Sequence, residues 1–145
     1  MESVYLLSGG LAIGLNLVAG AVGGLAWSRQ SPSTAFWHLL RGAQVLTAIF
    51  VLVESAVYVT GARAEYGLHY LYGFLPVVAM FLAEGTRAAA GRQELGDRDL
   101  ASLDDRQKTE LALAIIRRET GVMTLSCLVI AFLVWRALET TAGMF

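Results

Sequence analysis

The first part of the chain contains a long stretch without a charged residue. From Ser3 to Ser28 there is no Asp, Glu, Lys or Arg. A helix rises about 1.5 Å per residue and the hydrocarbon core of a bilayer is about 30 Å thick, so this stretch is long enough to cross a membrane. One acid and no base precede it, whereas a secretory signal peptide begins with Lys or Arg. The sequence therefore predicts a retained transmembrane helix rather than a cleaved signal.

Three further apolar runs follow, and together they predict an all-α integral membrane protein. The runs cover residues 43–60, 66–83 and 120–135, and Glu54 is the one Asp, Glu, Lys or Arg within them. Only 16% of all residues are charged, against about 25% in soluble domains. We predict one transmembrane domain over residues 1–145, with spans at about 4–27, 36–60, 66–86 and 119–137 and a connection at about 87–118. Because the last run is short, three spans with an interfacial helix are the alternative.

The basic residues are distributed unevenly between the connections. Nine of the eleven fall near the first and third connections: Arg29, Arg41, Arg87, Arg92, Arg98, Arg106, Lys108, Arg117 and Arg118. Cytoplasmic loops carry an excess of Lys and Arg, so these connections are predicted to face the cytoplasm and both termini the outside. The richness in Ala, Gly, Arg and Leu is consistent with a GC-rich bacterial genome, hence with a multi-pass protein of the bacterial cytoplasmic (inner) membrane. A net charge of −1 gives no indication of nucleic-acid binding.

The third connection contains a helix-start signal. "SLDD" at 102–105 predicts Ser102 as an N-cap with acidic residues in the first turn. The helix would run unbroken into the fourth span and reach about 35 residues, forming a cytoplasmic helical extension. We predict a solvated extension. The alternative is that the face of Leu111, Ile115 and Arg118 binds a partner or the headgroup region.

Small residues form two adjacent faces on the first span. One face contains Gly9, Ala12, Asn16, Gly20 and Gly23, and the other contains Gly10, Gly14, Ala21 and Gly24. In a bilayer, helices associate where small residues allow close approach of their backbones. The first helix is therefore predicted to be enclosed by its own bundle or by a partner chain. Short first and second connections predict an antiparallel four-helix bundle.

Polar residues in the second and third spans predict a cluster near the external surface. Glu54 lies about 9 Å from the outer end of its span, and His69 lies about one turn into the next. Tyr58 and Tyr72 lie at similar depth, and Asn16 is close enough in depth to join. Such a cluster suits proton-coupled chemistry, a quinone headgroup or a haem edge, since histidine exchanges protons near neutral pH. The alternative is that Glu54 and His69 satisfy each other and hold two helices together. Nearer the cytoplasm, Arg41 and Glu84 are predicted to form an ion pair.

A helix ending in "YVTGA" followed by one opening with "LHYLYG" resembles small four-helix haem-b membrane proteins, the cytochrome b561-like proteins and one half of haem A synthase. The resemblance implies haem b held between two histidines. This chain departs from that pattern, because His38 and His69 stand at opposite ends of the predicted bundle. His38 with Met123, or His69 alone, are the remaining candidate haem ligands. No His, Cys, Asp and Glu group has the spacing of a structural metal site.

The absence of a catalytic constellation favours a non-catalytic accessory or assembly subunit of a larger membrane complex, for example a respiratory one. Its partners would be the lipid bilayer and other membrane subunits, or further copies of itself. A second hypothesis is a redox protein that binds haem or quinone at the Glu54 and His69 cluster. A third is a small proton-coupled transporter acting as a dimer, which would share the intramembrane carboxylate.

Overall fold

The computed structural model describes residues 2–61, 64–65 and 67–141, and this part of the chain is almost entirely helical. Four long helices follow one another: α1 (Glu2–Ser28), α2 (Thr34–Val59), α3 (Leu68–Leu95) and α4 (Asp105–Glu139). A short 3₁₀ helix, η1 (Leu100–Ser102), precedes α4. Each of the four long helices is long and apolar enough to cross a membrane, which agrees with the four predicted spans.

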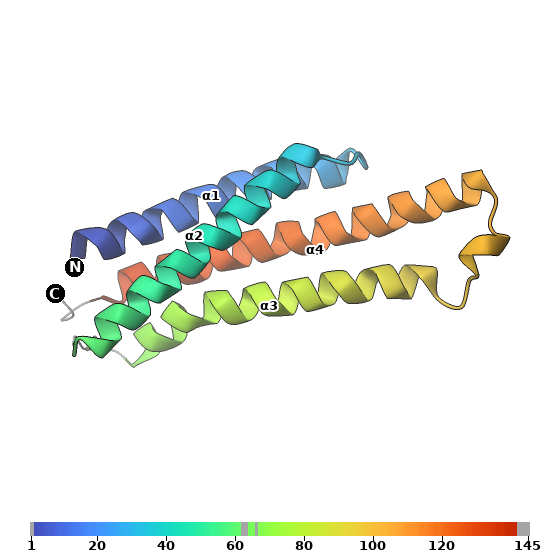
Figure 1. Cartoon of the computed structure of the whole chain (residues 1–145). Coiled ribbons are helices and arrows are strands. Elements are labelled where there is room, and N and C mark those ends of the chain that lie inside the picture. The colour runs from blue at the N-terminus through green and yellow to red at the C-terminus, as the bar shows by residue number, and fades with distance from the viewer. Residues whose placement is uncertain (1, 62–63, 66, 142–145) are drawn as a thin grey trace.

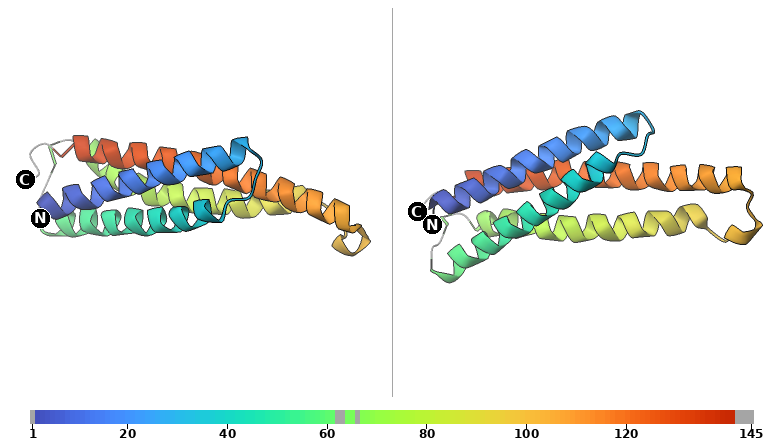
Figure 2. Two further views of the ribbon diagram at one scale, coloured as in Figure 1. Left: turned by 90° about the horizontal axis from the view of Figure 1, so that it is seen from above. Right: turned by 45° about the horizontal axis from the view of Figure 1, so that its top comes forward.

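The four helices form two antiparallel hairpins that pack together (Figure 1). α4 lies between α1 and α3 and packs against both, while α2 packs along α1 and crosses towards the start of α3. The α3–α4 hairpin extends well beyond the connection between α1 and α2 (Figure 2). Because successive helices are antiparallel, the start of α1 and the end of α4 lie at the same end of the bundle as the connection between α2 and α3 (Figure 1).

The third helix continues beyond the predicted end of its span near residue 86. α3 ends at Leu95, so residues 96–104 separate it from α4. The alanines at 88–90 favour helix after the apolar run has ended, and Ala90 is buried. Arg118 of α4 holds this extension by donating hydrogen bonds to Glu94 and Gln93 at 2.9 and 2.7 Å. The charged segment is thus a helical hairpin and not a loop before one helix.

α4 is 35 residues long, as predicted, but the predicted N-cap is wrong. The cap is Asp104, whose side chain accepts a hydrogen bond from the Gln107 backbone N–H at 2.7 Å. The Gln107 side chain accepts the Asp104 N–H in return at 3.0 Å, which completes a capping box. Ser102 instead donates to the Asp99 carbonyl and ends η1.

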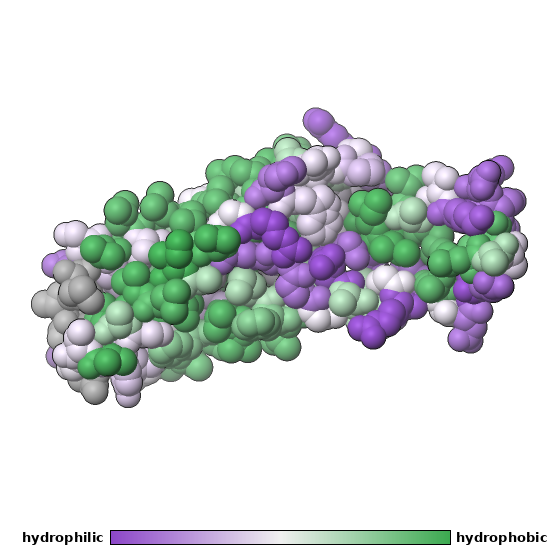
Figure 3. Space-filling model, viewed as in Figure 1, coloured by the Kyte–Doolittle hydropathy of each residue, from purple (hydrophilic) through white to green (hydrophobic). Residues whose placement is uncertain are grey.

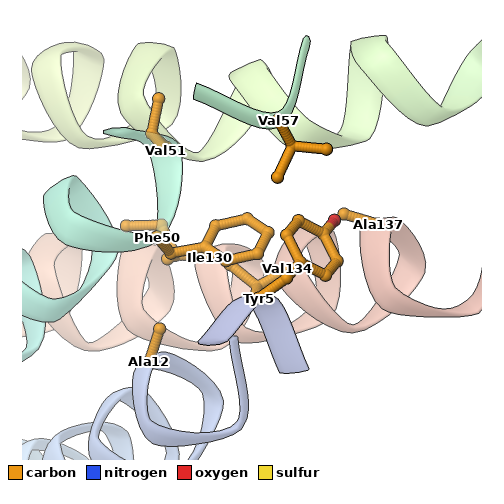
Figure 4. Close-up of a cluster of buried hydrophobic side chains, with 8 residues drawn as sticks. All are labelled: Tyr5, Ala12, Phe50, Val51, Val57, Ile130, Val134 and Ala137. Atoms are coloured by element: carbon orange, nitrogen blue, oxygen red, sulfur yellow. The ribbon is translucent and has the colours of Figure 1, made fainter. Parts of the chain in front are cut away.

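The first small-residue face of α1 is buried inside the bundle, as expected for close helix packing. A Cβ atom at Gly9 or Gly20 would lie within 3.0 Å of a leucine side chain of α4. The apolar core beside the start of α1 places the Tyr5 and Phe50 rings 5.4 Å apart (Figure 4). The second face of α1 differs, because a Cβ atom added at Gly10 or Gly14 would meet nothing within 4 Å.

Gly23→Ala is expected to destabilise the bundle by about 1–3 kcal/mol, because overpacking forces neighbouring side chains apart. Its Cβ would lie 2.5 Å from Phe36 Cε2 and closer still to Thr124 Oγ1. The measurement is thermal unfolding in detergent, and Gly14→Ala on the open face is the matched control. Equal melting temperatures for the two variants would contradict this account of α1 packing.

Oppositely charged side chains of α2 and α3 pair at the level that the sequence predicts to lie nearer the cytoplasm. Arg41 lies 2.6 Å from Glu84 Oε1, which confirms the predicted pair, and Gln44 donates to the same oxygen at 2.8 Å. Arg87 binds the other Glu84 oxygen at 2.8 Å. Figure 3 shows apolar side chains over the half that contains the start of α3, hydrophilic ones over the middle, and a mixture of the two towards the hairpin tip. From Glu119 to Arg136, α4 rises about 25 Å, close to the thickness of a hydrocarbon core.

Candidate functional site

Glu54 and His69 are completely buried and lie against each other. Glu54 stands near the end of α2 and His69 in the first turn of α3, where the two helices converge. The distance between His69 Nε2 and Glu54 Oε1 is 3.0 Å, and neither side chain has any exposed surface. The structure therefore brings together the acid and the imidazole that depth along the spans places at one level.

The second ring nitrogen of His69 determines where the hydrogen sits. His69 Nδ1 lies 3.1 Å from the Ala137 carbonyl oxygen and 3.2 Å from Thr140 Oγ1. A carbonyl oxygen can only accept, so we assign the hydrogen to Nδ1, which donates to α4. In a neutral imidazole, Nε2 would then present a lone pair to Glu54. The 3.0 Å contact therefore needs one proton between the two groups, either on the carboxyl or on the ring, and the pair carries no net charge in either case.

Tyr5 of α1 is the third member of the site. Its ring lies 6.2 Å from the His69 ring, and its hydroxyl is within interaction range of the Glu54 carboxylate. The sequence reasoning missed this residue, although a signal was present. Tyr5 continues the buried face of Gly9, Ala12 and Asn16 at spacings of four, seven and eleven residues, towards the outer end where Glu54 was placed. The site thus has contributions from all four helices.

Gly73 makes the space that Glu54 occupies. It lies one turn after His69 on the same face of α3, and it is buried. A Cβ atom at Gly73 would lie 2.8 Å from Glu54 Cδ and 2.9 Å from Glu54 Oε1. The carboxylate therefore lies directly on the α3 backbone, and only glycine permits this approach.

The other residues of the predicted cluster lie elsewhere. Asn16 donates hydrogen bonds to the Ala12 carbonyl at 2.9 Å and to Thr47 Oγ1 at 3.0 Å, which joins α1 to α2 deeper in the bundle. Tyr58 is 44% exposed and packs edge-to-face with Tyr70 at 5.2 Å. The Tyr72 ring lies under the Arg136 guanidinium at 5.5 Å. The prediction of a single five-residue cluster is thus corrected to a closed pair with Tyr5 beside it.

The candidate haem ligands are not arranged to bind iron. His38 is exposed and its Nδ1 lies 2.9 Å from the Thr34 carbonyl, whereas Met123 is buried in an apolar cluster with Phe36 and Leu40. His38 and Met123 therefore face different surroundings, the surface and the core. His69 Nε2 is completely buried and lies 3.0 Å from Glu54 Oε1, and Nδ1 lies 3.1 Å from the Ala137 carbonyl oxygen, so a metal could reach His69 only by displacing Glu54. Within the described ranges, no group of three or more His, Cys, Asp and Glu side chains forms a metal site.

No family model, curated protein or solved structure matches this chain. The resemblance to cytochrome b561-like proteins therefore stays a prediction. On its own chemistry, the closed site can hold a proton inside the bundle and connect α2, α3 and α4 near the connection between α2 and α3.

Proposed function

We propose that the protein is a non-catalytic accessory or assembly subunit of a larger membrane complex, and that α1 is the helix through which it joins. In this proposal it resides in the bacterial inner membrane with both termini outside, as the excess of Lys and Arg at the opposite end favours. The complex would contain at least one further subunit that contributes a transmembrane helix.

The enclosure of Glu54 and His69 supports a structural role for the pair. Both side chains have no exposed surface, and both ring nitrogens are engaged. A substrate or cofactor would have to separate this pair before it could reach either group. Burying an acid in an apolar bundle is costly, and the contact with His69 removes much of that cost.

The open face of α1 is the observation that carries the proposal. Gly10 and Gly14 are exposed and have the small-xxx-small spacing at which transmembrane helices pack closely. Beside them, an apolar groove of about 260 Å³ runs between α1 and α4. The groove is lined by Ile13, Leu17, Leu128, Ala131, Phe132 and Trp135. A second transmembrane helix laid on the glycines would also fill this groove, which the described residues of this chain leave open.

The proposal predicts that bulk on the open face of α1 releases the partner. The double variant Gly10→Leu/Gly14→Leu is expected to fold normally and to lose at least tenfold in the yield of the complex, because the leucines hold the two backbones apart. The measurement is purification from the native host in a mild detergent, with the mass of the intact complex and its visible spectrum. Gly85→Leu is the matched control, since Gly85 is also an exposed helical glycine with open space at its Cβ.

Three outcomes would overturn the proposal. Equal recovery of the complex from the Gly10/Gly14 and Gly85 variants would remove α1 as the contact. A wild-type protein that runs alone as a colourless dimer of itself would instead favour the proton-coupled transporter. A Soret band in the purified protein would favour the haem-associated redox protein.

A further inference from the structure

A second groove lies at the inner end of the bundle, where α1 ends against α4. It has a volume of about 510 Å³ and is lined by Trp27, Glu94, Ala114, Arg117, Arg118, Gly121, Val122 and Leu125. Trp27 forms one wall, because a Cβ atom at Gly121 would lie 2.9 Å from the indole Cε2. The indole is therefore seated on the α4 backbone, and Gly121 is what allows this.

The groove contains an uncompensated positive charge. The Arg118 guanidinium is held by Glu94 at 2.9 Å and by Gln93 at 2.7 Å, so the one acid in the lining is already neutralised. The Arg117 side chain has no carboxylate or hydrogen-bond partner in the part of the chain that the structure describes. It also borders an adjoining cavity of about 260 Å³ that includes Gln30, Leu113 and Glu110, and Glu110 is paired with Arg106 at 2.9 Å. Arg117 is thus an exposed side chain that lines both concave surfaces.

The groove changes from polar to apolar along α4. Arg117 lies at its charged end, and Val122 and the 55% exposed Leu125 lie about 7 and about 12 Å further along the helix. Trp27 stands between them at the end of the uncharged run of α1, the level at which tryptophan sits among lipid headgroups. A ligand that fits this surface has an anionic head and an apolar tail.

We propose that this groove binds an anionic phospholipid, with its phosphate on Arg117 and one acyl chain along Val122 and Leu125. A guanidinium forms paired, charge-assisted hydrogen bonds with phosphate oxygens. Basic pockets at the cytoplasmic ends of transmembrane helices bind anionic headgroups. The site is separate from the open face of α1 and does not depend on the partner proposed above.

The test uses the purified full-length protein in detergent, titrated with phosphatidylglycerol or with phosphatidylcholine. Phosphatidylglycerol is expected to raise the Tm by about 4 °C more than phosphatidylcholine. The groove exists only in the native fold, so a lipid that binds it stabilises the native state over the unfolded chain. Arg117→Gln is expected to abolish most of that difference and to reduce the phosphatidylglycerol retained in native mass spectrometry. Lys108→Gln is the matched control, since it removes the same charge from α4 about 13 Å away at the hairpin tip.

Several outcomes would overturn the lipid site. Equal Tm shifts with the two lipids would remove the role of the headgroup charge. An Arg117→Gln variant that responds like the wild type, or a Lys108→Gln variant that loses the response, would remove Arg117 as its ligand. A full shift with inorganic phosphate alone would indicate a free anion and not a lipid.

Discussion

His69→Leu is expected to lower the free energy of unfolding by about 3–5 kcal/mol, among the largest effects of any single substitution in this chain. Glu54 would then keep its buried position without the group 3.0 Å away that shares its proton. Removing one member of a buried ionisable pair is strongly destabilising, because the other is left without compensation. Loss of the hydrogen bond from His69 would cost less at the Ala137 carbonyl, since this oxygen also accepts hydrogen bonds from the Thr140 backbone and side chain.

The double variant Glu54→Leu/His69→Leu separates this cause from simple loss of packing. Replacing a buried pair with apolar residues of similar size is often close to neutral, so the double variant should be more stable than His69→Leu alone. The measurement is a double-mutant cycle by chemical unfolding in mixed micelles. If the two single substitutions add without coupling, the pair does not contribute as argued here.

Glu54→Gln distinguishes a structural role of the pair from a proton-carrying one. The amide can donate to His69 Nε2 while His69 Nδ1 still donates to α4, so the expected loss of stability is only about 1 kcal/mol. Assembly of the proposed complex should survive, because the closed geometry is kept. A variant that folds and assembles normally but has lost all activity would instead show that the proton of the pair is used in function.

Part of the site was predictable because depth along a helix follows from counting residues. Glu54 and His69 lie on either side of the connection between α2 and α3, Arg41 and Glu84 lie at similar distances from it further along the same two antiparallel helices, and both pairs meet. Which further groups join them depends on lateral position, which counting does not give. Asn16 lies about 16 Å further along α1 than Tyr5 and bonds to Thr47, whereas the Ala137 carbonyl of α4 approaches His69.

The helix ends were harder to predict for a different reason. Hydropathy identifies where a chain leaves the hydrocarbon, whereas helix ends are set by caps and by backbone propensity. α3 therefore passes Arg87 and ends at Leu95, before Gly96 with its positive φ of 55°. The N-cap of α4 is Asp104 and not Ser102, because Gln107 completes the capping box only with Asp104.

Gly73→Ala is expected to destabilise the protein by about 3 kcal/mol, a large effect for one methyl group. The new Cβ would lie 2.8 Å from Glu54 Cδ and 2.9 Å from its Cγ, so the carboxylate must move. Movement adds loss of the contact with His69 to an overpacking cost of about 1–3 kcal/mol.

The companion substitution Gly85→Ala lies on the same helix, and its Cβ would meet nothing within 4 Å. It should therefore change stability by no more than about 0.5 kcal/mol, as exposed substitutions do. The decisive comparison is Gly73→Ala in a Glu54→Ala background. Because the shortened side chain of Glu54→Ala leaves this space empty, Gly73→Ala should cost almost no stability in that background. The effects of Gly73→Ala and Glu54→Ala should therefore be strongly non-additive. If Gly73→Ala costs the same with and without the Glu54 side chain, the clash is elsewhere and Gly73 does not position the acid.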